Sequence, residues 1–510
     1  MDVAELVYWG HEKALGTYKH PPLPAWIADA VFSLTHQVWP LYLLAQLTLA
    51  ATVLALYRLA RRVLPQRDAL IASAAALTLY SVVFVSPEFN NNAAMEPFWI
   101  LAILATHRAL TQPAKANALA WWLATGLFLA LAAWCKYSAA TLAASIAIAL
   151  VATREGRAAL RTPGPYLAAA ATLAILSPHL WWLKHNEFIS FAYAESRPVR
   201  GHTTAKLLNL LEFLAAIGAN LAPAALCLIP ILYRPFRRRA SKEPLPEGGV
   251  RVGDEQSPIH EVRADSTESP RPTLLLPHSD SPRPTPFDRR FIAITTLGPI
   301  LIHIAAAIAL NVGLRATWAS ALSIPLPMLL LTRLHTRPRG TRPALVAIIA
   351  VNLALAASLI IYSSRTPRSP HITPRTAYPM PDLAREVQRR WEQQTQTPTP
   401  PAIIGEPWIA SETALYFNPR SHVSGAYNNL ADSRPLNPRI DPWLSPDRVA
   451  QGAVILWWLP SDGPTTRGTM NPVLARLFPK AVEQDPIDLN YPRSNPPSRV
   501  RVGLAIIKPN

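Results

Sequence analysis

Apolar residues along this chain come in long blocks separated by short polar stretches. Each block runs for roughly 16 to 25 residues, and a helix of that length crosses a hydrocarbon core of about 30 Å. The pattern therefore predicts an α-helical polytopic membrane protein with about ten spans. The two short blocks around "AWCKYSAAT" are either two spans or one re-entrant hairpin. The predicted spans are 38–59, 69–86, 97–111, 118–134, 137–152, 165–183, 207–233, 291–310, 318–333 and 343–362.

The stretches between the blocks alternate in charge. The Arg-rich stretches face the cytoplasm by the positive-inside rule, and they are 57–67, 107–115, 153–161, 234–239 and 333–342. Both termini and the remaining stretches then face outward, and these stretches are 1–37, 87–97, 135–138, 184–202 and 311–317. No apolar segment precedes the outward-facing first residues. We therefore expect that a first transmembrane helix is missing because an internal Met was taken as the start.

The same pattern divides the chain into membrane and soluble parts. Residues 402–406, 453–459 and 500–507 read as strands, and 380–394 as a helix with Leu383, Val387 and Trp391 on one face. They predict a small outer C-terminal α/β domain. A stretch rich in Pro, Ser and charged residues predicts a disordered insert. The predicted parts are an outer-face loop with interfacial helices (1–37), the first part of the transmembrane bundle (38–233), the disordered cytoplasmic insert (234–290), the last part of the bundle (291–362) and a periplasmic α/β domain (363–510).

Composition agrees with a membrane protein. Half of the residues are hydrophobic, 16% are charged and the mean hydropathy is +0.14. The net charge of +17 could indicate nucleic-acid binding, but the Arg residues cluster in short loops, which favours a topological role and no nucleic-acid partner. The two cysteines, Cys135 and Cys227, lie in apolar blocks, so we expect small core residues rather than a disulfide framework or a zinc site.

Ionisable and amide side chains gather in the outward stretches. Asp2, Glu5, Trp9 and Glu12 recur at helical spacing, which predicts carboxylates on one face of a short surface helix. Further along stand the other polar candidates of the outer face: Lys19, His20, Asn91, Glu96, Lys136, Tyr137, Glu195, Arg197 and Arg315. Any one of them alone could be a solvated charge without a role.

Together they suit one chemistry at a membrane surface. A carboxylate can act as general base on an acceptor hydroxyl, and cations can stabilise the charge on a departing lipid phosphate. Transfer of a sugar from a lipid phosphate needs both, and it needs no nucleotide-binding Gly-rich loop, which this sequence lacks. A transporter would instead place ionisable groups near mid-membrane, and the predicted spans hold few.

Several segments resemble a known group of enzymes. "DVAELVYWGHEKALGTYKHPPLPAW", "FNNNAAMEPFW", "WCKYSA" and "SPHLWWLKHNEFISFAYAESR" are similar to bacterial glycosyltransferases of the protein-mannosyltransferase-like superfamily. That superfamily includes the lipid A aminoarabinose transferases and other polyprenyl-phosphate-dependent sugar transferases. The resemblance covers roughly 1–362, and "GEPWIASETALYFNP" and "IDPWL" resemble the outer domain of the same subgroup. It implies a bundle of transmembrane helices with large outer loops and an outer C-terminal domain.

The resemblance also implies roles for individual residues. The catalytic Asp of the family falls on Asp2, but Val3 breaks the usual Asp-Glu pair, so Glu5 is the alternative base. Lys19-His20-Pro21 stands where the aminoarabinose transferases have Glu-Lys-Pro, and either cation would meet the lipid phosphate. The missing Glu puts the family's metal ligands in doubt, so a divalent metal ion stays an open alternative. The resemblance also places functional positions at Glu96, before Pro97, and near Glu195 to Arg197. With the outward polar residues, the candidates are Lys136, Arg197 and Arg315 for the donor phosphate and Asn91, Glu96, Tyr137 and Glu195 for substrate, with Asn91 and Glu96 also candidates for a metal contact.

The prediction is an integral inner-membrane glycosyltransferase. It would move a sugar from a polyprenyl-phosphate donor to a periplasmic acceptor such as lipid A, lipopolysaccharide or another cell-envelope glycan, with inversion if a single displacement operates. Its partners are then the lipid-linked sugar, a lipid or glycan acceptor and membrane lipids. The alternatives are a protein O-glycosyltransferase and a lipid-linked-sugar flippase or transporter.

Overall fold

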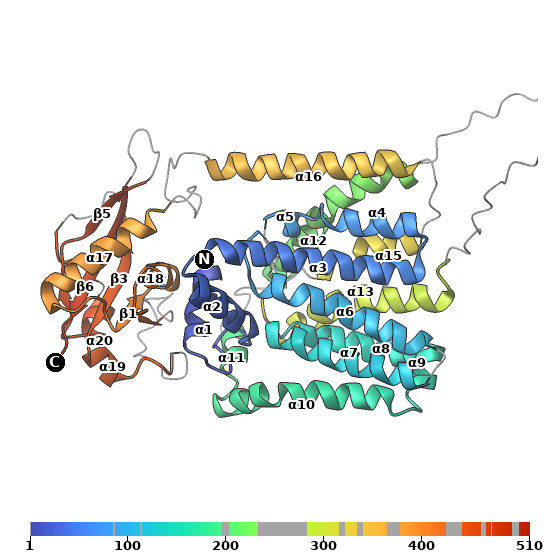
Figure 1. Cartoon of the computed structure of the whole chain (residues 1–510), viewed down its shortest axis with the longest axis horizontal. Helices are drawn as coiled ribbons and strands as arrows, with labels where there is room; N and C mark the ends of the chain where they lie inside the picture. The colour runs from blue at the N-terminus through green and yellow to red at the C-terminus, as the bar shows by residue number, and fades with distance from the viewer. Residues whose placement is uncertain are drawn as a thin grey trace, which may run out of the picture.

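The computed structural model consists of a helical bundle and a smaller domain built on a sheet (Figure 1). Three short helices lie between these two parts: α1 (Asp2–His11), α2 (Leu23–Thr35) and α11 (Ile189–Glu195). The structure describes residues 2–84, 87–112, 115–195, 203–232, 283–315, 322–333, 340–364, 378–424, 441–460, 466–470, 472–491 and 499–510.

Six helices of the described residues are long and apolar enough to cross a membrane. They run side by side along the long axis of the molecule (Figure 1). Large apolar side chains such as Leu301 and Ile308 are exposed on them, as expected of a surface that faces lipid rather than water. The chain is therefore a helical polytopic membrane protein. The six helices are α3 (Trp39–Val63), α7 (Lys115–Cys135), α10 (Gly164–His185), α12 (Thr203–Leu232), α13 (Pro286–Leu310) and α16 (Thr341–Ser364).

Shorter helices complete the bundle, and one of them corrects a predicted span. The block 69–86 forms two helices instead of one, because the chain turns between Ala76 and Tyr80. The side chain of Asn220 accepts a hydrogen bond from the backbone N–H of Ser81 at 2.7 Å, which satisfies a donor that the break leaves free. The shorter bundle helices are α4 (Gln66–Ala76), α5 (Tyr80–Phe84), α6 (Asn91–Thr111), α8 (Ala139–Ala152), α9 (Arg154–Ala159) and α15 (Leu326–Arg333).

Most of the predicted insert, 234–290, lies outside the described residues. Its predicted C-terminal boundary is wrong. Helix α13 begins at Pro286, inside the range predicted as disordered. Thr285 and Asp288 form a capping box, in which the Thr285 hydroxyl accepts from the N–H of Asp288 and the Asp288 carboxylate accepts from the N–H of Thr285. Because of this cap, Arg289 and Arg290 belong to α13, whereas the predicted insert had included them.

Helix α1 is buried, which corrects the prediction of a surface helix. Residues 3–10 of α1 are all buried. On one side α1 packs against α2 so closely that a side chain at Gly10 would lie 2.1 Å from the carbonyl oxygen of Ala25. On another side it contacts helix α18 (Pro407–Ala414) of the smaller domain. The predicted carboxylate face therefore lies between the bundle and the smaller domain.

The smaller domain is a mixed sheet flanked by helices. Strand β1 (Ala402–Gly405) pairs in parallel with β2 (His422–Ser424) and β3 (Ala453–Leu459), and β3 pairs antiparallel with β6 (Arg499–Ile507). Strands β4 (Val482–Glu483) and β5 (Ile487–Asn490) both pair antiparallel with β6. The helices are α17 (Met380–Thr395), α18, α19 (Pro446–Ala450) and α20 (Pro472–Leu477).

The sequence-based predictions for this domain are confirmed for the three strands and for α17. Leu383, Val387 and Trp391 form the buried face of that helix. The two cysteines are also buried and free, as predicted.

Candidate functional site

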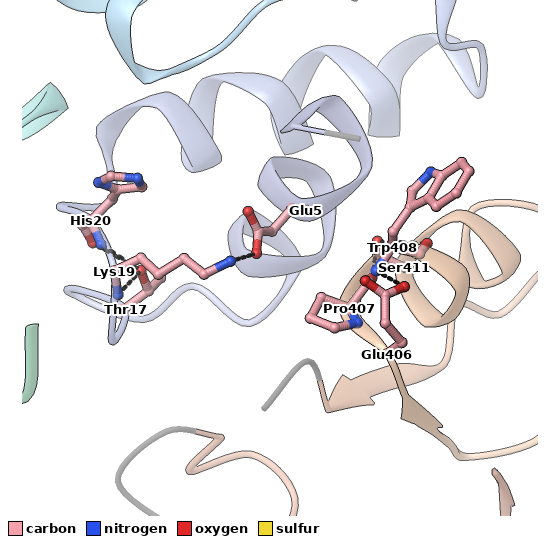
Figure 2. A network of polar contacts seen from close by, with 8 residues as sticks. All are labelled: Glu5, Thr17, Lys19, His20, Glu406, Pro407, Trp408 and Ser411. Atoms are coloured by element: carbon pink, nitrogen blue, oxygen red, sulfur yellow. Dashed lines mark hydrogen bonds and ion pairs between the residues drawn. The ribbon is translucent and has the colours of Figure 1, made fainter. Parts of the chain in front are cut away.

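The loop between α1 and α2 brings a lysine back over α1. The Thr17 hydroxyl accepts from the backbone N–H groups of Lys19 and His20 and donates to the carbonyl oxygen of His20, which closes a tight turn. Pro22 precedes α2, so the proline pair links this turn to the start of the helix. The turn points the Lys19 ammonium at the Glu5 carboxylate, and the two form an ion pair (Figure 2).

This ion pair lies in an apolar and aromatic setting. Glu5 is only 8% exposed, and burial raises the pKa of its carboxyl while the charge of Lys19 opposes that rise. The Lys19 ammonium lies 5.5 Å from the ring centroid of Trp9 and 5.3 Å from that of Tyr18. Two ring faces therefore stabilise the cation where little water reaches it.

A second lysine lies near a second buried carboxyl group. Lys136, in the turn after α7, donates a hydrogen bond to the side-chain oxygen of Asn92. Burial lowers the pKa of Lys136 to about 8, against the charges of Asp2 and Glu96. Glu96, the second carboxyl group, is only 2% exposed. Glu96 precedes the predicted span 97–111, and its Oε2, like Oδ1 of Asn91, has no hydrogen-bond partner among the described residues.

Asp2 connects the two pairs. Its negative charge raises the pKa of Glu5 and also that of Lys136. Asp2 is partly exposed, whereas Glu5 and Glu96 are buried. Of the three carboxyl groups, Asp2 is the one that an incoming molecule can reach.

A chain of hydrogen bonds fixes the loop that carries Lys19. His179 of α10 contacts the carbonyl oxygen of Leu15 through Nδ1 at 2.7 Å and the Tyr137 hydroxyl through Nε2 at 3.1 Å. The Tyr137 hydroxyl donates to Ser190 at 3.0 Å, and Ser190 donates to the carbonyl oxygen of Thr17 at 2.8 Å. The loop is thus tied to the same turn that holds Lys136.

The smaller domain covers this site with α18. Glu406 accepts hydrogen bonds from the backbone N–H groups of Trp408 and Ile409 and caps α18, and Figure 2 shows it on the side of α18 that faces Glu5. The hydroxyl of Tyr8 is buried and has no hydrogen-bond partner among the described residues, and burial raises its pKa. These groups close the site on the side away from the bundle.

The His20 side chain lies at the edge of this cluster. Its ring centroid is 6.4 Å from that of Trp9, which also flanks Lys19, and its backbone N–H helps to close the turn. Three other predicted residues lie apart from the cluster or have side chains outside the description. Arg315 is exposed, next to the hydrogen bonds that join Leu314 to Asn209. Glu195 ends α11 and its side chain is not described, and Arg197 lies outside the described residues.

No role was predicted from the sequence for the supporting residues. Thr17, His179 and Ser190 hold the loop, yet they stand far apart in sequence and only their side-by-side packing reveals the connection. The described residues contain no group of three or more His, Cys, Asp or Glu that could hold a metal ion. No residues can therefore be assigned to a divalent metal from this geometry.

The arrangement combines a carboxylate with two ammonium groups, and all three residues, Asp2, Lys19 and Lys136, are partly buried. Asp2 can accept a proton from a hydroxyl group, because its carboxylate oxygens are hydrogen-bond acceptors on a partly exposed residue. Lys19 and Lys136 can stabilise an oxyanion, and such cations act strongly where water is excluded. A phosphate ester that reaches this end of the bundle would meet both lysines.

Three comparisons with known proteins agree on one group. Residues 19–182 match the sequence model of the family described as dolichyl-phosphate-mannose-protein mannosyltransferase. The lipid A galacturonosyltransferase RgtD of Rhizobium johnstonii is 28% identical over 243 residues, which are 47% of this chain and 50% of that protein. The chain thus spans about half the length of this curated relative. The family resemblance predicted from the motifs is confirmed.

Solved structures agree with the fold. The crystal structure of ArnT from Cupriavidus metallidurans bound to undecaprenyl phosphate superposes with a TM-score of 0.55, over 98% of this chain and 92% of that one, at 13% identity. The same protein in the apo state gives a TM-score of 0.52 over 99% and 93%, at 14% identity. The chain therefore has an ArnT-like fold, with the bundle and the sheet domain both included.

Proposed function

We propose that this protein is a membrane glycosyltransferase that moves a sugar from a polyprenyl-phosphate donor to a lipid A or lipopolysaccharide acceptor. The observation that carries the proposal is a cluster of charged groups, in which Glu5 pairs with Lys19 and the charge of Asp2 acts on both Glu5 and Lys136. The similarity to a lipid A galacturonosyltransferase supports the acceptor, and the undecaprenyl phosphate named in the ArnT structure supports the donor class.

In the proposed reaction the acceptor hydroxyl oxygen bonds to the anomeric carbon of the sugar. The bond from that carbon to the phosphate oxygen breaks, and its electron pair leaves with the lipid phosphate. Asp2 takes the hydroxyl proton as general base, and Lys19 and Lys136 stabilise the phosphate that leaves. A single displacement of this kind inverts the anomeric centre.

Glu5 is the less suitable base in this arrangement. It is buried and its carboxylate is already paired with Lys19. Its proposed role is to hold that ammonium toward the phosphate position, and Thr17 and the hydrogen bonds to α10 and α11 hold the loop. Asn91, Glu96 and Tyr137 remain candidates for substrate contacts, as do His20, Glu195, Arg197 and Arg315.

The proposal includes a topology of about ten spans in a bacterial inner membrane. The Arg-rich stretches would face the cytoplasm, and the site and the sheet domain would face the periplasm. In this arrangement four further spans lie beside the six long helices, and they are formed by α6, by α8, by α15 and by α4 together with α5. The lipid tail of the donor would lie in the bilayer and its phosphate at the periplasmic interface.

A protein acceptor is the second candidate, because the matching family is described by a protein mannosyltransferase activity. Both candidates use the same donor chemistry and differ only in the hydroxyl that attacks. An extract from which proteins or lipids have been removed separates them, since label then appears only in the fraction that holds the acceptor.

The test is an assay of sugar transfer in membranes that contain the protein. Radiolabelled polyprenyl-phosphate sugars are supplied with an extract that provides acceptors, and wild type is compared with Asp2→Asn. The matched control is Asp382→Asn, at an exposed Asp that pairs with Arg385 one turn along α17. We expect transfer to disappear in Asp2→Asn and to persist in Asp382→Asn at equal protein levels.

Equal transfer by wild type and Asp2→Asn would remove Asp2 as base. Movement of the labelled lipid across the bilayer without loss of its sugar would instead indicate the flippase or transporter.

A further inference from the structure

A groove lined by aromatic rings opens on the sheet domain. Tyr378 packs against three rings at once, with centroid distances of 4.6 Å to Trp408, 5.5 Å to Trp458 and 5.3 Å to Tyr491. The ring planes meet at 80°, 63° and 74°, so the rings form walls rather than a flat stack. Tyr378, Trp408 and Trp458 are only half-buried, so their ring surfaces are available to a ligand.

The sheet register explains why these rings meet. Parallel strands β1 and β3 end at the same edge, and Trp408 follows β1 while Trp458 lies at the end of β3. Antiparallel pairing brings the end of β5 and the beginning of β6 to that edge, which adds Tyr491 and Arg499. Ligands of open α/β sheets bind outside the carboxyl ends of the strands, and this groove occupies that position.

Trp457 and Trp458 are consecutive residues of β3, so their side chains point to opposite faces of the sheet. Trp457 packs on Gly503 of the neighbouring strand so tightly that a Cβ there would lie 2.0 Å from its ring. The next residue, Trp458, points to the opposite face, as alternation along a strand requires. The stability of the sheet therefore depends on Trp457, whereas Trp458 lines the groove.

The charge of the groove favours an anion. Arg501 is buried and bound by both oxygens of Asp488, at 2.5 and 2.8 Å. The hydrogen bond from Arg501 is the largest cause that lowers the pKa of Asp488, and the charges of Arg501 and Arg499 lower it further. One carboxylate therefore lies near two guanidinium groups. Arg499 is exposed at the rim, and a guanidinium fork suits a phosphate.

The groove is the size of one ring, and one of its walls belongs to the helix that contacts α1. Its volume is about 170 Å³, below the roughly 300–1,000 Å³ of pockets that enclose a whole small molecule. Trp408 is on α18, the helix that contacts α1, and Figure 2 shows it beside Glu406 on the side of the domain that faces Glu5. A molecule held here by one sugar ring could extend toward Asp2.

We infer that this groove binds a phosphorylated sugar ring of the acceptor headgroup, and the inference rests on the proposed function. A sugar ring can pack its apolar face on the aromatic side chains of the groove. The guanidinium of Arg499 can donate hydrogen bonds to a phosphate group on that sugar. The groove then selects the acceptor, while the cluster around Asp2 acts on the donor.

Binding tests the groove without any transfer. The probe is a bis-phosphorylated glucosamine disaccharide without acyl chains, titrated into the full-length protein in detergent and compared with the same disaccharide without phosphates. We expect saturable binding of the phosphorylated probe, weakened about tenfold in Trp458→Ala, as loss of one aromatic contact allows. Arg499→Gln should weaken only the phosphorylated probe, and Trp458→Phe should restore most of the affinity.

The matched control is Tyr416→Ala, which removes a half-exposed aromatic residue of the same domain outside the groove. Equal affinity in wild type, Trp458→Ala and Arg499→Gln, with unchanged unfolding temperatures, would overturn the inference. Transfer to lipid acceptors that is insensitive to both variants would also reject the groove but leave the proposed function intact. Specific probe binding in a protein that consumes no donor would support the groove and reject the transferase.

Discussion

The Glu5–Lys19 pair shows how one contact can serve both stability and chemistry. Both side chains are about nine-tenths buried, with exposed fractions of 11% each. The desolvation cost of burying two ions is offset only while they attract each other. Removal of one of them leaves a buried charge without compensation. The aromatic rings around Lys19 partly replace water for the cation.

Lys19→Met should therefore destabilise the protein more than the double variant Lys19→Met/Glu5→Gln. We expect a loss of roughly 3 kcal/mol for the single change, as for other broken buried pairs, and recovery of part of that loss in the double variant. Thermal unfolding in detergent measures both, with Glu5→Gln completing the cycle. Additive effects of the two changes would contradict a direct energetic coupling between these residues.

Lys136 predicts how the activity depends on pH. Its pKa is lowered to about 8, so it loses its positive charge as the pH rises through that value. Only the charged form stabilises a departing phosphate, and transfer should therefore fall at alkaline pH. Lys136→Arg keeps the charge, because a guanidinium does not titrate in this range, and should remove the alkaline decrease. A decrease that survives in Lys136→Arg, measured with one donor across pH 6 to roughly 10, would assign it to another group.

The residues of the site could be predicted from the sequence only in part. Polarity in outward stretches drew attention to Glu5, Lys19 and Lys136, since charged groups beside apolar blocks are conspicuous. Which of them pair could not be predicted, because the ion pair depends on a turn closed by Thr17. Arg315 looked equivalent in sequence, yet it is exposed and bonded to none of the other candidates among the described residues.

At the scale of elements, local patterns predicted what depends on local structure. Short apolar runs located β1, β3 and β6, which are buried along almost their whole length, and helical periodicity located α17, which has one buried face. The break between α4 and α5 was missed because the sequence there is continuously apolar and the free backbone donor is satisfied by Asn220 of another helix. The burial of α1 was missed because the domain that covers it lies about 400 residues away in sequence.

The loop that carries Lys19 is an element held by its neighbours, and Tyr137 tests that support. Tyr137→Phe removes only a hydroxyl that contacts His179 and Ser190. Two hydrogen bonds at about 1 kcal/mol each predict a loss of stability near 2 kcal/mol. We also expect the KM for the donor to rise more than kcat falls, because the loop positions a phosphate contact. Phe188→Ala, at a half-exposed ring of the same region, is the control.

A loss of stability without any change in donor KM would mean that the hydrogen bonds support the fold alone. Ser190→Ala should then show the same behaviour, because it interrupts the next bond of the chain to Thr17.

At the scale of the whole molecule, polar contacts fasten the sheet domain onto α1 and α2. His422 Nδ1 contacts both carboxylate oxygens of Glu12 at 2.9 Å, and Arg420 pairs with Asp29 at 2.7 Å. Arg420 also donates to Ser33 and lies over the ring of Phe32. These contacts keep the groove of the domain and the cluster around Asp2 at a fixed separation, which sequential binding of acceptor and donor requires.

A charge exchange across this interface tests whether the contact acts as a pair. Arg420→Asp places two carboxylates together and should loosen the domain, whereas Arg420→Asp with Asp29→Arg restores opposite charges in the same place. Hydrogen exchange in α1 reports the change, because its backbone is protected while the domain covers it. We expect faster exchange across α1, by about tenfold if the opening costs roughly 1.4 kcal/mol less, and protection regained in the double variant. The bundle helix α13, which lies away from this interface, should exchange equally in all three proteins. Faster exchange that the reciprocal change does not reverse would mean that Arg420 acts through its contact with Phe32 and not through charge.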